Sequence, residues 1–238
     1  MKNYLNTLIE KGYSVAENYL NADEVTFWQN KWNDIQKSAL LEEYGIKQAN
    51  KNNNMPNYNI VYKEDNNYVW KSTGKIIQTN EGKKLVEKIL NEFVPINANI
   101  KFMYDKFMNQ KPGYQGHAPH QDNAVGKNEY HTNKLYSAYI SLSDTDEESG
   151  CLWVENTYPK RTESLKYCDT GCVAGNECFC SNIKLLPTDM NKWKGHDLIP
   201  IPLKKGDCVF FDGWALHGTA ANLSENIRQT MIFHCGVM

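Results

Sequence analysis

Two histidines and one aspartate in this 238-residue chain have the types and the order of a metal site. One residue separates His120 from Asp122, and His217 follows 95 positions after Asp122 (217 − 122). Two imidazoles and one carboxylate on one face of an iron ion leave three adjacent coordination positions open, which is the arrangement of non-haem Fe(II) oxygenases. A His-x-Asp tripeptide alone is common by chance, and a lone histidine is more often structural. The prediction of a metal site therefore depends on all three residues and on their neighbours.

An arginine, Arg228, stands eleven positions after His217 (228 − 217). Its guanidinium is a planar, permanently charged fork that binds a carboxylate through two parallel hydrogen bonds. Beside an iron ion, such a side chain suits a dicarboxylate co-substrate, which the metal holds at one end and the arginine at the other. The combination predicts an oxygenase that uses O2 and a dicarboxylic acid.

The candidate ligands have to be positioned by extended chain, because alternate residues of a strand point the same way. In a strand or extended turn, His120 and Asp122 project together while Gln121 points elsewhere. By the same alternation, Thr219 lies on the face of His217. Each of the two ligand-bearing segments is therefore expected to present one face to the metal.

The segment after the second histidine is expected to turn back on itself. A turn over residues 220–226 makes the strands on either side of it an antiparallel pair, and it brings Arg228 close to the metal without making it a ligand. Four residues at alternate positions of the later strand then share one face: Arg228, Thr230, Ile232 and His234.

From about residue 99 the chain consists of short apolar stretches broken by turn residues. Gly206, in Lys-Lys-Gly-Asp, marks a tight turn between two of them. Many short strands with turn signals predict a sandwich or barrel, and a double-sheet jelly roll is one solution. The predicted strands cover residues 100–108, 134–142, 151–155, 198–203, 207–211, 215–219 and 227–235.

The earlier part of the chain is a mixture of helix and strand. A helix is predicted over residues 22–44, where apolar residues recur at mostly helical spacing, and Asn21 or Asp23 is its expected N-cap. A second helix is predicted over residues 81–93. Short strands are predicted at 59–62 and 68–71, and an Asn-rich loop at 50–59.

The length of 238 residues suits one domain with a sizeable core. We expect a single domain over residues 1–238. In it, a helical and strand region of about residues 1–97 packs outside a jelly-roll core of about residues 98–238. The fold class is therefore mainly β, with flanking helices.

Composition and charge exclude some classes of partner. Net charge is −2 and the sequence pI is about 6.3, whereas a general nucleic-acid surface needs a basic stripe. No apolar run approaches the roughly 18 residues of a membrane span, and the first residues lack the apolar segment of a secretory signal. We therefore expect a cytoplasmic protein that acts on a small molecule, with no nucleic-acid or membrane partner. The sequence leaves the oligomeric state open.

The seven cysteines fall into two groups. In a chain without a secretory signal, a cluster of cysteines is not a disulfide framework by default. Free thiols are favoured, while a disulfide and a zinc site, for which a C-x-C pair is cramped, stay open. The clustered residues are Cys168, Cys172, Cys178 and Cys180, and the scattered ones, which we predict to be core residues, are Cys151, Cys208 and Cys235.

Several short motifs in the chain resemble the phytanoyl-CoA dioxygenase family of Fe(II)- and 2-oxoglutarate-dependent oxygenases. The likeness extends over about residues 12–237. It implies a double-stranded β-helix core, Fe(II) as the metal, and 2-oxoglutarate and O2 as co-substrates. The motifs are Gln110-Lys-Pro-Gly, Pro119-His-Gln-Asp122, Ser149-Gly-Cys-Leu-Trp, Gly206-Asp-Cys-Val-Phe-Phe-Asp, Leu216-His-Gly-Thr219 and Asn226-Ile-Arg228.

The resemblance assigns roles to individual residues by position. His120, Asp122 and His217 match the family's iron ligands. Arg228 matches the residue that pairs with the distal carboxylate of 2-oxoglutarate, and Thr219 falls where a hydroxyl residue often supports that carboxylate. Two weaker matches to the co-substrate pocket are Tyr139 and Phe107.

Aromatic residues in the regions that wall the pocket of relatives are candidates for substrate contact, although most such residues serve ordinary packing. One departure from the family concerns this region. Relatives often carry a Pro-Gly-Ser/Thr-His turn where this chain reads Glu155-Asn-Thr-Tyr158, so the role of that histidine is not transferred. The candidates are Tyr130, His131, Trp153 and Tyr158.

Asp122 is intact, whereas halogenating relatives replace this carboxylate with a small residue. The resemblance therefore implies hydroxylation with release of succinate and CO2, and we expect the substrate to be a small organic metabolite or natural-product intermediate. Desaturation, cyclisation and epimerisation use the same ligands and stay open. A module that binds iron and 2-oxoglutarate without catalysis, and a purely structural jelly roll, are alternatives of a different class. We assign no general base beyond the metal ligands.

Overall fold

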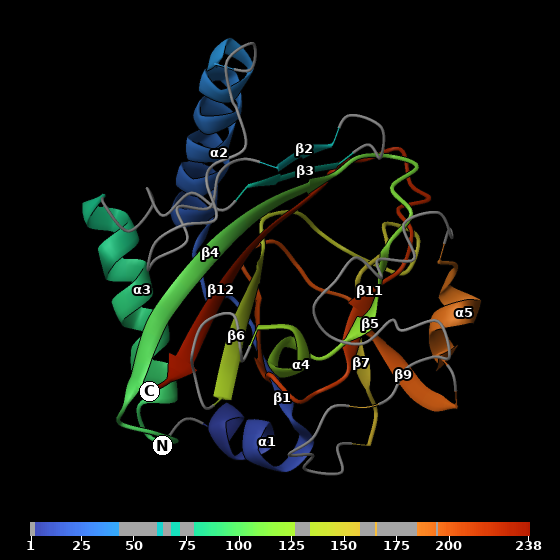
Figure 1. Ribbon diagram of the computed structural model, residues 1–238. Coiled ribbons are helices and arrows are strands. Elements are labelled where there is room, and N and C mark those ends of the chain that lie inside the picture. The colour runs from blue at the N-terminus through green and yellow to red at the C-terminus, as the bar shows by residue number, and fades with distance from the viewer. Residues whose placement is uncertain are drawn as a thin grey trace.

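The computed structural model describes residues 3–42, 61–63, 68–71, 79–126, 134–157, 165, 185–193 and 195–238 (Figure 1). In chain order, the elements are α1 (Asn3–Lys11), β1 (Tyr13–Ala16), α2 (Ala22–Glu42), β2 (Val61–Lys63), β3 (Tyr68–Lys71), α3 (Asn80–Phe93), β4 (Ile100–Gln110), β5 (His117–His120), α4 (Asp122–Gly126), β6 (Lys134–Ser141), β7 (Leu152–Glu155), α5 (Pro187–Asn191), β8 (Lys192–Trp193), β9 (His196–Ile201), β10 (Cys208–Asp212), β11 (His217–Thr219) and β12 (Arg228–Val237).

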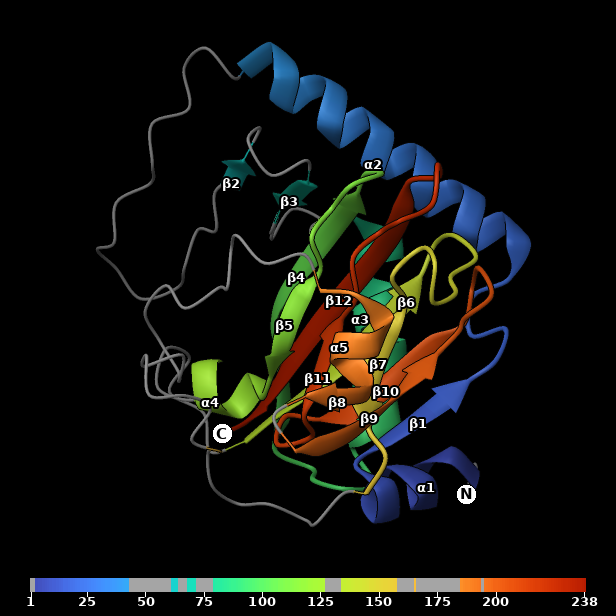
Figure 2. The same ribbon diagram turned by 90° about the vertical axis from the view of Figure 1, so that its right-hand side faces the viewer.

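Two antiparallel sheets face each other and form the body of the protein (Figures 1 and 2). The larger sheet has the strand order β1-β10-β6-β12-β4-β3-β2, and the smaller has the order β5-β11-β7-β9-β8. Alternate side chains of both sheets meet in an apolar cluster between them. The prediction of a mainly β chain with a jelly-roll core is confirmed. The buried members of this inner cluster are Tyr139, Leu152, Val154, Ile201, Leu203, Val209 and Phe211.

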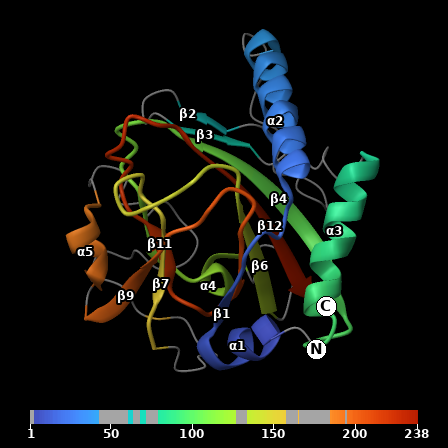
Figure 3. The same ribbon diagram turned by 180° about the vertical axis from the view of Figure 1, so that it is seen from behind.

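The helices α1, α2 and α3 pack against the outer face of the larger sheet (Figure 3). On α2 the spacing of Val25, Trp28 and Trp32 places three buried side chains on one side of the helix, as its periodicity predicts. Its N-terminus is a capping box: the Asn21 side chain accepts from the backbone N–H of Glu24, whose carboxylate accepts from the N–H of Asn21. The predicted helix and one of its two candidate caps are therefore confirmed.

The smaller sheet is covered on its outer face by α5 and by Leu185, which precedes this helix. Trp153 and Leu198 of the sheet pack there against Leu185 and Met190. The two faces of the strand β7 therefore contact different apolar clusters. Val154 points inward, toward the cluster between the sheets, while Trp153 points outward, toward α5. This alternation decides which residues can reach a site between the sheets.

The predicted pairing of the strands around residues 220–226 is wrong. β11 lies between β5 and β7 in the smaller sheet, while β12 lies between β4 and β6 in the larger one. Both edges of each strand are already paired, so the connection crosses from one sheet to the other. Asn222 holds this crossing by donating to the carbonyl oxygens of Gln110 and Asn226, at 2.8 Å each. Arg228 consequently approaches the ligands from the opposite sheet.

The predicted turn at Gly206 is confirmed, and the residue has to be glycine for two reasons. Its φ is +95°, a region that L side chains rarely adopt. A Cβ there would also lie 2.4 Å from the carbonyl oxygen of Leu20. The turn before the strand β10 therefore packs closely against the backbone of the loop before α2.

No helix in the described part of the chain is long and apolar enough to cross a membrane.

Candidate metal and co-substrate site

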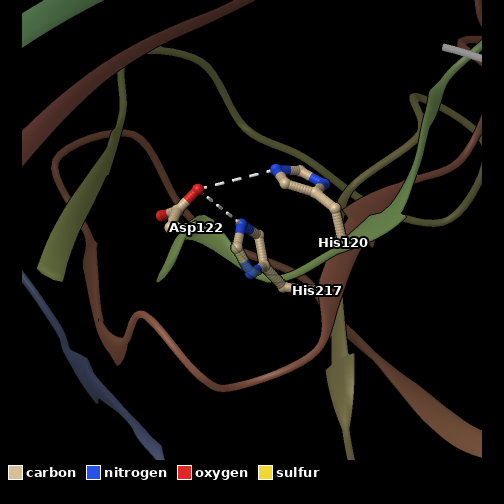
Figure 4. A group of neighbouring side chains, drawn as sticks. All are labelled: His120, Asp122 and His217. Carbon is tan, nitrogen blue, oxygen red and sulfur yellow. Dashed lines mark ion pairs between the residues drawn. The ribbon is translucent and has the colours of Figure 1, made fainter. Parts of the chain in front are cut away.

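Three side chains converge between the sheets with their ligand atoms facing one another (Figure 4). His120 ends β5, Asp122 begins α4 and His217 begins β11. Asp122 Oδ1 lies 3.6 Å from His120 Nε2 and 3.7 Å from His217 Nε2, and all three ligand atoms lie within 4.8 Å of one another. These separations are too long for hydrogen bonds. They leave room for an ion at about 2.0–2.2 Å from each atom.

Strand pairing brings the two histidines together. His120 lies opposite His217 in the antiparallel β5–β11 pair, and the imidazole centroids are 4.4 Å apart. The backbones approach closely at Gly218, where a Cβ would lie 2.6 Å from the carbonyl oxygen of His117 and 2.8 Å from the nitrogen of Pro119. The residue after the second histidine ligand therefore has to be glycine.

The carboxylate joins the histidines because the chain changes from strand to helix between them. Gln121, which lies between His120 and Asp122, points away from the metal site as predicted. Its amide donates to the carbonyl of Trp214 at 2.7 Å and accepts from the N–H of Leu165 at 2.8 Å. These two bonds fix the intervening residue, so that its neighbours on either side both face the site.

Backbone carbonyls set the protonation pattern of both imidazoles. His120 Nδ1 lies 2.9 Å from the carbonyl oxygen of Ala118, and His217 Nδ1 lies 3.0 Å from that of Ala215. Because a carbonyl oxygen only accepts, each Nδ1 has to carry the proton. Each Nε2 then offers its lone pair toward Asp122, which is the arrangement that a metal ligand needs.

The second oxygen of the carboxylate is bound by polar neighbours. Asp122 Oδ2 accepts a hydrogen bond from Ser137 Oγ at 2.6 Å and lies 3.4 Å from His234 Nδ1. Burial by itself would raise the pKa of Asp122, but His234 and His217 hold this pKa well below its ordinary value of 3.8. The carboxylate is therefore ionised at neutral pH and suited to a divalent cation.

Arg228 lies at the start of β12 and is 1 % exposed. Its Nε donates to Gln110 Oε1, while Nη1 and Nη2 have no hydrogen-bond partner among the described residues. A buried guanidinium with two unpaired nitrogens is costly unless an anion completes its hydrogen bonds. A carboxylate, which accepts two parallel bonds from such a fork, fits this vacancy in chemical type. The residues present thus fit both the metal and a dicarboxylate such as 2-oxoglutarate.

Two buried hydroxyl groups on inner strand faces also have no hydrogen-bond partner in the described structure. Thr219 Oγ1 lies on β11, two residues after the ligand His217, and Tyr139 Oη lies on β6 among the inner apolar cluster. Buried hydroxyl groups that face a space between sheets and have no protein partner are typical of a site that is completed by a polar ligand. We therefore keep Thr219 and Tyr139 as proposed co-substrate contacts.

Phe107 and Trp153 are corrections to the sequence-based expectation, because both point away from the space between the sheets. Phe107 packs on the outer face of the larger sheet, where its ring stacks on Trp32 with centroids 5.0 Å apart. Trp153 lies opposite Gly218 in the β7–β11 pair and packs in the outer cluster below α5. Strand alternation explains both errors, since each lies one residue from an inward-facing position.

Replacing Phe107 with leucine is expected to lower stability without changing co-substrate binding. The loss of a stacked aromatic pair in a fully buried cluster should cost about 1–3 kcal/mol of the free energy of unfolding. Urea unfolding and a calorimetric titration of 2-oxoglutarate into the nickel-loaded protein measure the two properties. Trp32→Leu is the matched control, because it removes the other half of the pair. A loss of 2-oxoglutarate affinity in Phe107→Leu but not in Trp32→Leu would instead support Phe107 as a co-substrate contact.

The other expected substrate residues and the clustered cysteines lie outside the described residues, so their roles stay predictions. These are Tyr130, His131 and Tyr158, together with Cys168, Cys172, Cys178 and Cys180. The three scattered cysteines are buried free thiols, as predicted.

The buried histidines predict that the metal-free protein loses stability in mild acid. Burial lowers the pKa of His217 to about 4, and it also lowers the pKa of His117 and His234 below 6.5. Between pH 6.5 and about 4 the unfolded chain therefore binds more protons than the folded one, so stability falls as pH falls. His217 alone accounts for on the order of 3 kcal/mol.

Chemical denaturation of the metal-free protein at several pH values between 7 and 4.5 measures this loss. His217→Leu, which removes one of the titrating groups, should show a smaller slope of stability against pH. A free energy of unfolding that stays constant over this interval would contradict the burial of neutral imidazoles.

A comparison with known protein families agrees with this site. The sequence model of the family described as "Phytanoyl-CoA dioxygenase (PhyH)" matches residues 8–230. The chain belongs to the phytanoyl-CoA dioxygenase family. A similar protein of this family is "Phytanoyl-CoA dioxygenase domain-containing protein 1" of Danio rerio, which is 26% identical over 155 residues. The match covers 63% of this chain and 48% of the relative, so it spans about half of the relative's length.

Solved structures with the same fold include three proteins that are 12–16% identical to this phytanoyl-CoA dioxygenase family member. The non-heme alpha ketoglutarate dependent carbocyclase SnoK has a TM-score of 0.64, with 99% of this chain and 83% of that chain covered. The epimerase SnoN, in complex with Fe3+, alpha ketoglutarate and nogalamycin RO, has a TM-score of 0.67 (99% and 82%). HygX from Streptomyces hygroscopicus, with nickel, 2-oxoglutarate and hygromycin B, has a TM-score of 0.65 (99% and 87%). At these identities the likeness establishes the fold.

The family match confirms the predicted family, and the structure brings the three predicted metal ligands together. Sequence reasoning nevertheless missed polar residues that surround the ligands. His234 shares the face of Arg228 by alternation and was expected there, but Ser137 on the neighbouring strand was not singled out. Gln110, which accepts a hydrogen bond from Arg228, was noted in the sequence only as the first residue of a family motif. The pairing of β6 and β4 with β12, which places these residues, is not visible in a single sequence.

Proposed function

We propose that this protein, as a member of a family of iron- and 2-oxoglutarate-dependent oxygenases, hydroxylates a small organic metabolite or natural-product intermediate and releases succinate and CO2. One observation carries the proposal. Arg228 is a buried cation whose two terminal nitrogens have no partner in the described structure, and it faces the same inter-sheet space as the His120, Asp122 and His217 ligand set. An enzyme that binds a dicarboxylate between a metal and an arginine needs this pair of features.

The chain's own residues define the chemistry. His120 and His217 offer neutral Nε2 atoms and Asp122 offers one carboxylate oxygen, so these three residues would hold the metal. Arg228 would orient the far carboxylate of 2-oxoglutarate, with Thr219 and Tyr139 beside it. The bound iron and 2-oxoglutarate supply the oxidising power, drawing on O2. The apolar cluster between the sheets excludes water from the reacting groups.

Hydroxylation is the favoured outcome because Asp122 supplies the carboxylate ligand and leaves no vacancy for a halide. Desaturation, cyclisation and epimerisation remain alternatives within the same chemistry, and two of the structurally similar enzymes are a carbocyclase and an epimerase. The products distinguish them by mass. Hydroxylation adds one oxygen atom, desaturation or cyclisation removes two hydrogens, and epimerisation leaves the mass unchanged.

The substrate is proposed to be a small organic molecule, acted on in the cytoplasm, with no nucleic-acid or membrane partner. A CoA thioester is less favoured, because the sequence carries no evident basic clamp for its phosphates. We treat residues 1–238 as a single catalytic domain.

Anaerobic visible absorption tests the proposal directly. Fe(II) and then 2-oxoglutarate are added to the metal-free protein, and a charge-transfer band that requires both additions is expected. Admission of O2 with a panel of small metabolites should then give succinate coupled to a product of altered mass or configuration. A folded, iron-loaded protein that shows no band would overturn the proposal. Binding of both groups without any coupled turnover would support a non-catalytic binding module instead.

A further inference from the structure

The second oxygen of the metal-binding carboxylate takes part in a buried chain of hydrogen bonds. Asp122 Oδ2 lies 2.6 Å from Ser137 Oγ, which in turn lies 2.9 Å from His234 Nδ1. Ser137 is 0 % exposed and His234 is 2 % exposed. The predicted ligand set does not require these hydrogen bonds, because the metal needs only the other oxygen, Oδ1.

The direction of each hydrogen bond follows from the chemistry of the groups. An ionised carboxylate only accepts, so Ser137 donates its single hydroxyl proton to Asp122. The hydroxyl oxygen then has to accept from His234, whose Nδ1 must carry a proton. This Nδ1 also lies 3.4 Å from Asp122 Oδ2, so both neighbours direct a donor toward the same oxygen. His234 Nε2, which has no partner in the described structure, is then an unprotonated acceptor.

The surrounding sheet holds the two donors in place. Ser137 on β6 lies opposite His234 on β12 in the antiparallel ladder, so the backbone fixes their separation. The imidazole of His234 also stacks on Tyr104 of β4, with ring centroids 4.2 Å apart and planes 24° from parallel. A chain of three buried groups supported by three neighbouring strands leaves the carboxylate little freedom to rotate.

We propose that Ser137 and His234 are positioning residues that restrict Asp122 to binding the metal through Oδ1 alone. A carboxylate can bind a cation through one or both oxygens, and binding through both would occupy one of the positions that 2-oxoglutarate and O2 need. Oδ2 is prevented from joining because it accepts the hydroxyl proton of Ser137, and His234 Nδ1, which holds that hydroxyl in place, lies 3.4 Å from it. This inference rests on the proposed function. It explains how three coordination positions of the metal stay open although a carboxylate can bind through either one or two oxygens.

Separate titrations of metal and co-substrate test the inference. Without the donors, Oδ2 can turn to the metal, so metal affinity is retained while 2-oxoglutarate has to displace an oxygen. Ser137→Ala and His234→Phe should therefore lower the affinity of the Co(II)-loaded protein for 2-oxoglutarate by about 10–100-fold. Their affinity for Co(II) itself should stay within about threefold of the wild type. The visible spectrum of bound Co(II) should also change before 2-oxoglutarate is added, because its coordination differs.

Conservative variants and a matched control separate positioning from folding. Ser137→Thr keeps the hydroxyl and His234→Asn keeps a donor near the Nδ1 position, so both should recover much of the affinity for 2-oxoglutarate. Ser141→Ala, which removes another buried hydroxyl from the same strand, should change neither affinity, because its Oγ donates to the carbonyl of Ser143.

The outcomes distinguish this inference from the proposed function. A wild-type protein that binds Co(II) but no 2-oxoglutarate would overturn the proposed function and the inference with it. Wild-type binding, together with unchanged 2-oxoglutarate affinity in Ser137→Ala and His234→Phe, would overturn the inference alone. Equal losses of Co(II) and 2-oxoglutarate affinity would also overturn it, because the two residues would then only support the fold of the site.

Discussion

Replacing Arg228 with methionine is expected to weaken 2-oxoglutarate binding at least about 100-fold while leaving the ligand-free protein nearly as stable as the wild type. The first effect follows because truncating one partner of a buried charged pair costs about 3 kcal/mol or more. The second follows because the wild-type guanidinium is buried and two of its nitrogens have no partner among the described residues. A hydrophobic side chain of similar length removes that cost, although Gln110 loses one hydrogen bond.

Thermal unfolding with and without co-substrate measures both effects in one experiment. The nickel-loaded wild type should be stabilised by about 3 kcal/mol when 2-oxoglutarate is present at roughly 100 times its dissociation constant, whereas Arg228→Met should gain less than about 0.5 kcal/mol at the same concentration. Gln229→Ala is the control, because it alters the next residue on the opposite strand face. A large drop in the stability of ligand-free Arg228→Met would mean that the arginine already has a structural partner, and the assignment would fail.

Replacing Asp122 with alanine is expected to lower metal affinity by at least about 100-fold, because a direct ligand is lost. The variant loses the only anionic ligand of the three, so two neutral imidazoles face the cation alone. Ser137 also loses the acceptor of its hydroxyl proton. Calorimetric titration with Co(II) measures the affinity, and the anaerobic Fe(II)–2-oxoglutarate absorption band should disappear.

Glu155→Gln is the matched control for this prediction. Glu155 is also a buried carboxylate beside a histidine, with its Oε1 3.0 Å from His196 Nδ1, but it lies outside the ligand set. It should lose some stability and keep its metal affinity. Equal metal affinities in wild type and Asp122→Ala would contradict the identification of the triad as a metal site.

The metal site was predictable from the sequence because its chemistry depends on residue types with few substitutes. Two imidazoles, a carboxylate and a distant arginine are rare in combination, and strand alternation correctly placed Gln121 away from the ligands. The jelly roll was predictable because short strands and turn residues recur along the later half of the chain. Strand bounds were close as well: the predicted strand at 68–71 coincides with β3.

The errors arise where the outcome depends on which strands become neighbours. The strands β11 and β12 follow each other in sequence, yet each is already paired on both edges within a different sheet. Phe107 and Trp153 were assigned to the wrong face because a shift of one residue reverses the direction of a side chain. The helix α1 and the strand β1 were not predicted at all. Their position depends on β10, nearly 200 residues later in the chain, which the local sequence does not specify.

The pairing of His120 with His217 makes the metal a link between two distant parts of the chain. An ion bound to both closes a loop of 97 residues (217 − 120), as a disulfide would, and a covalent link over such a loop is worth about 4–5 kcal/mol in the chain-entropy view. Unlike a disulfide, this link opens whenever the ion leaves. It also cannot form until the chain has been synthesised beyond β11, so a nascent chain cannot hold iron in its oxidising form before the strands that enclose it exist. Loss of iron should therefore shorten the lifetime of the folded protein as well as stop its chemistry.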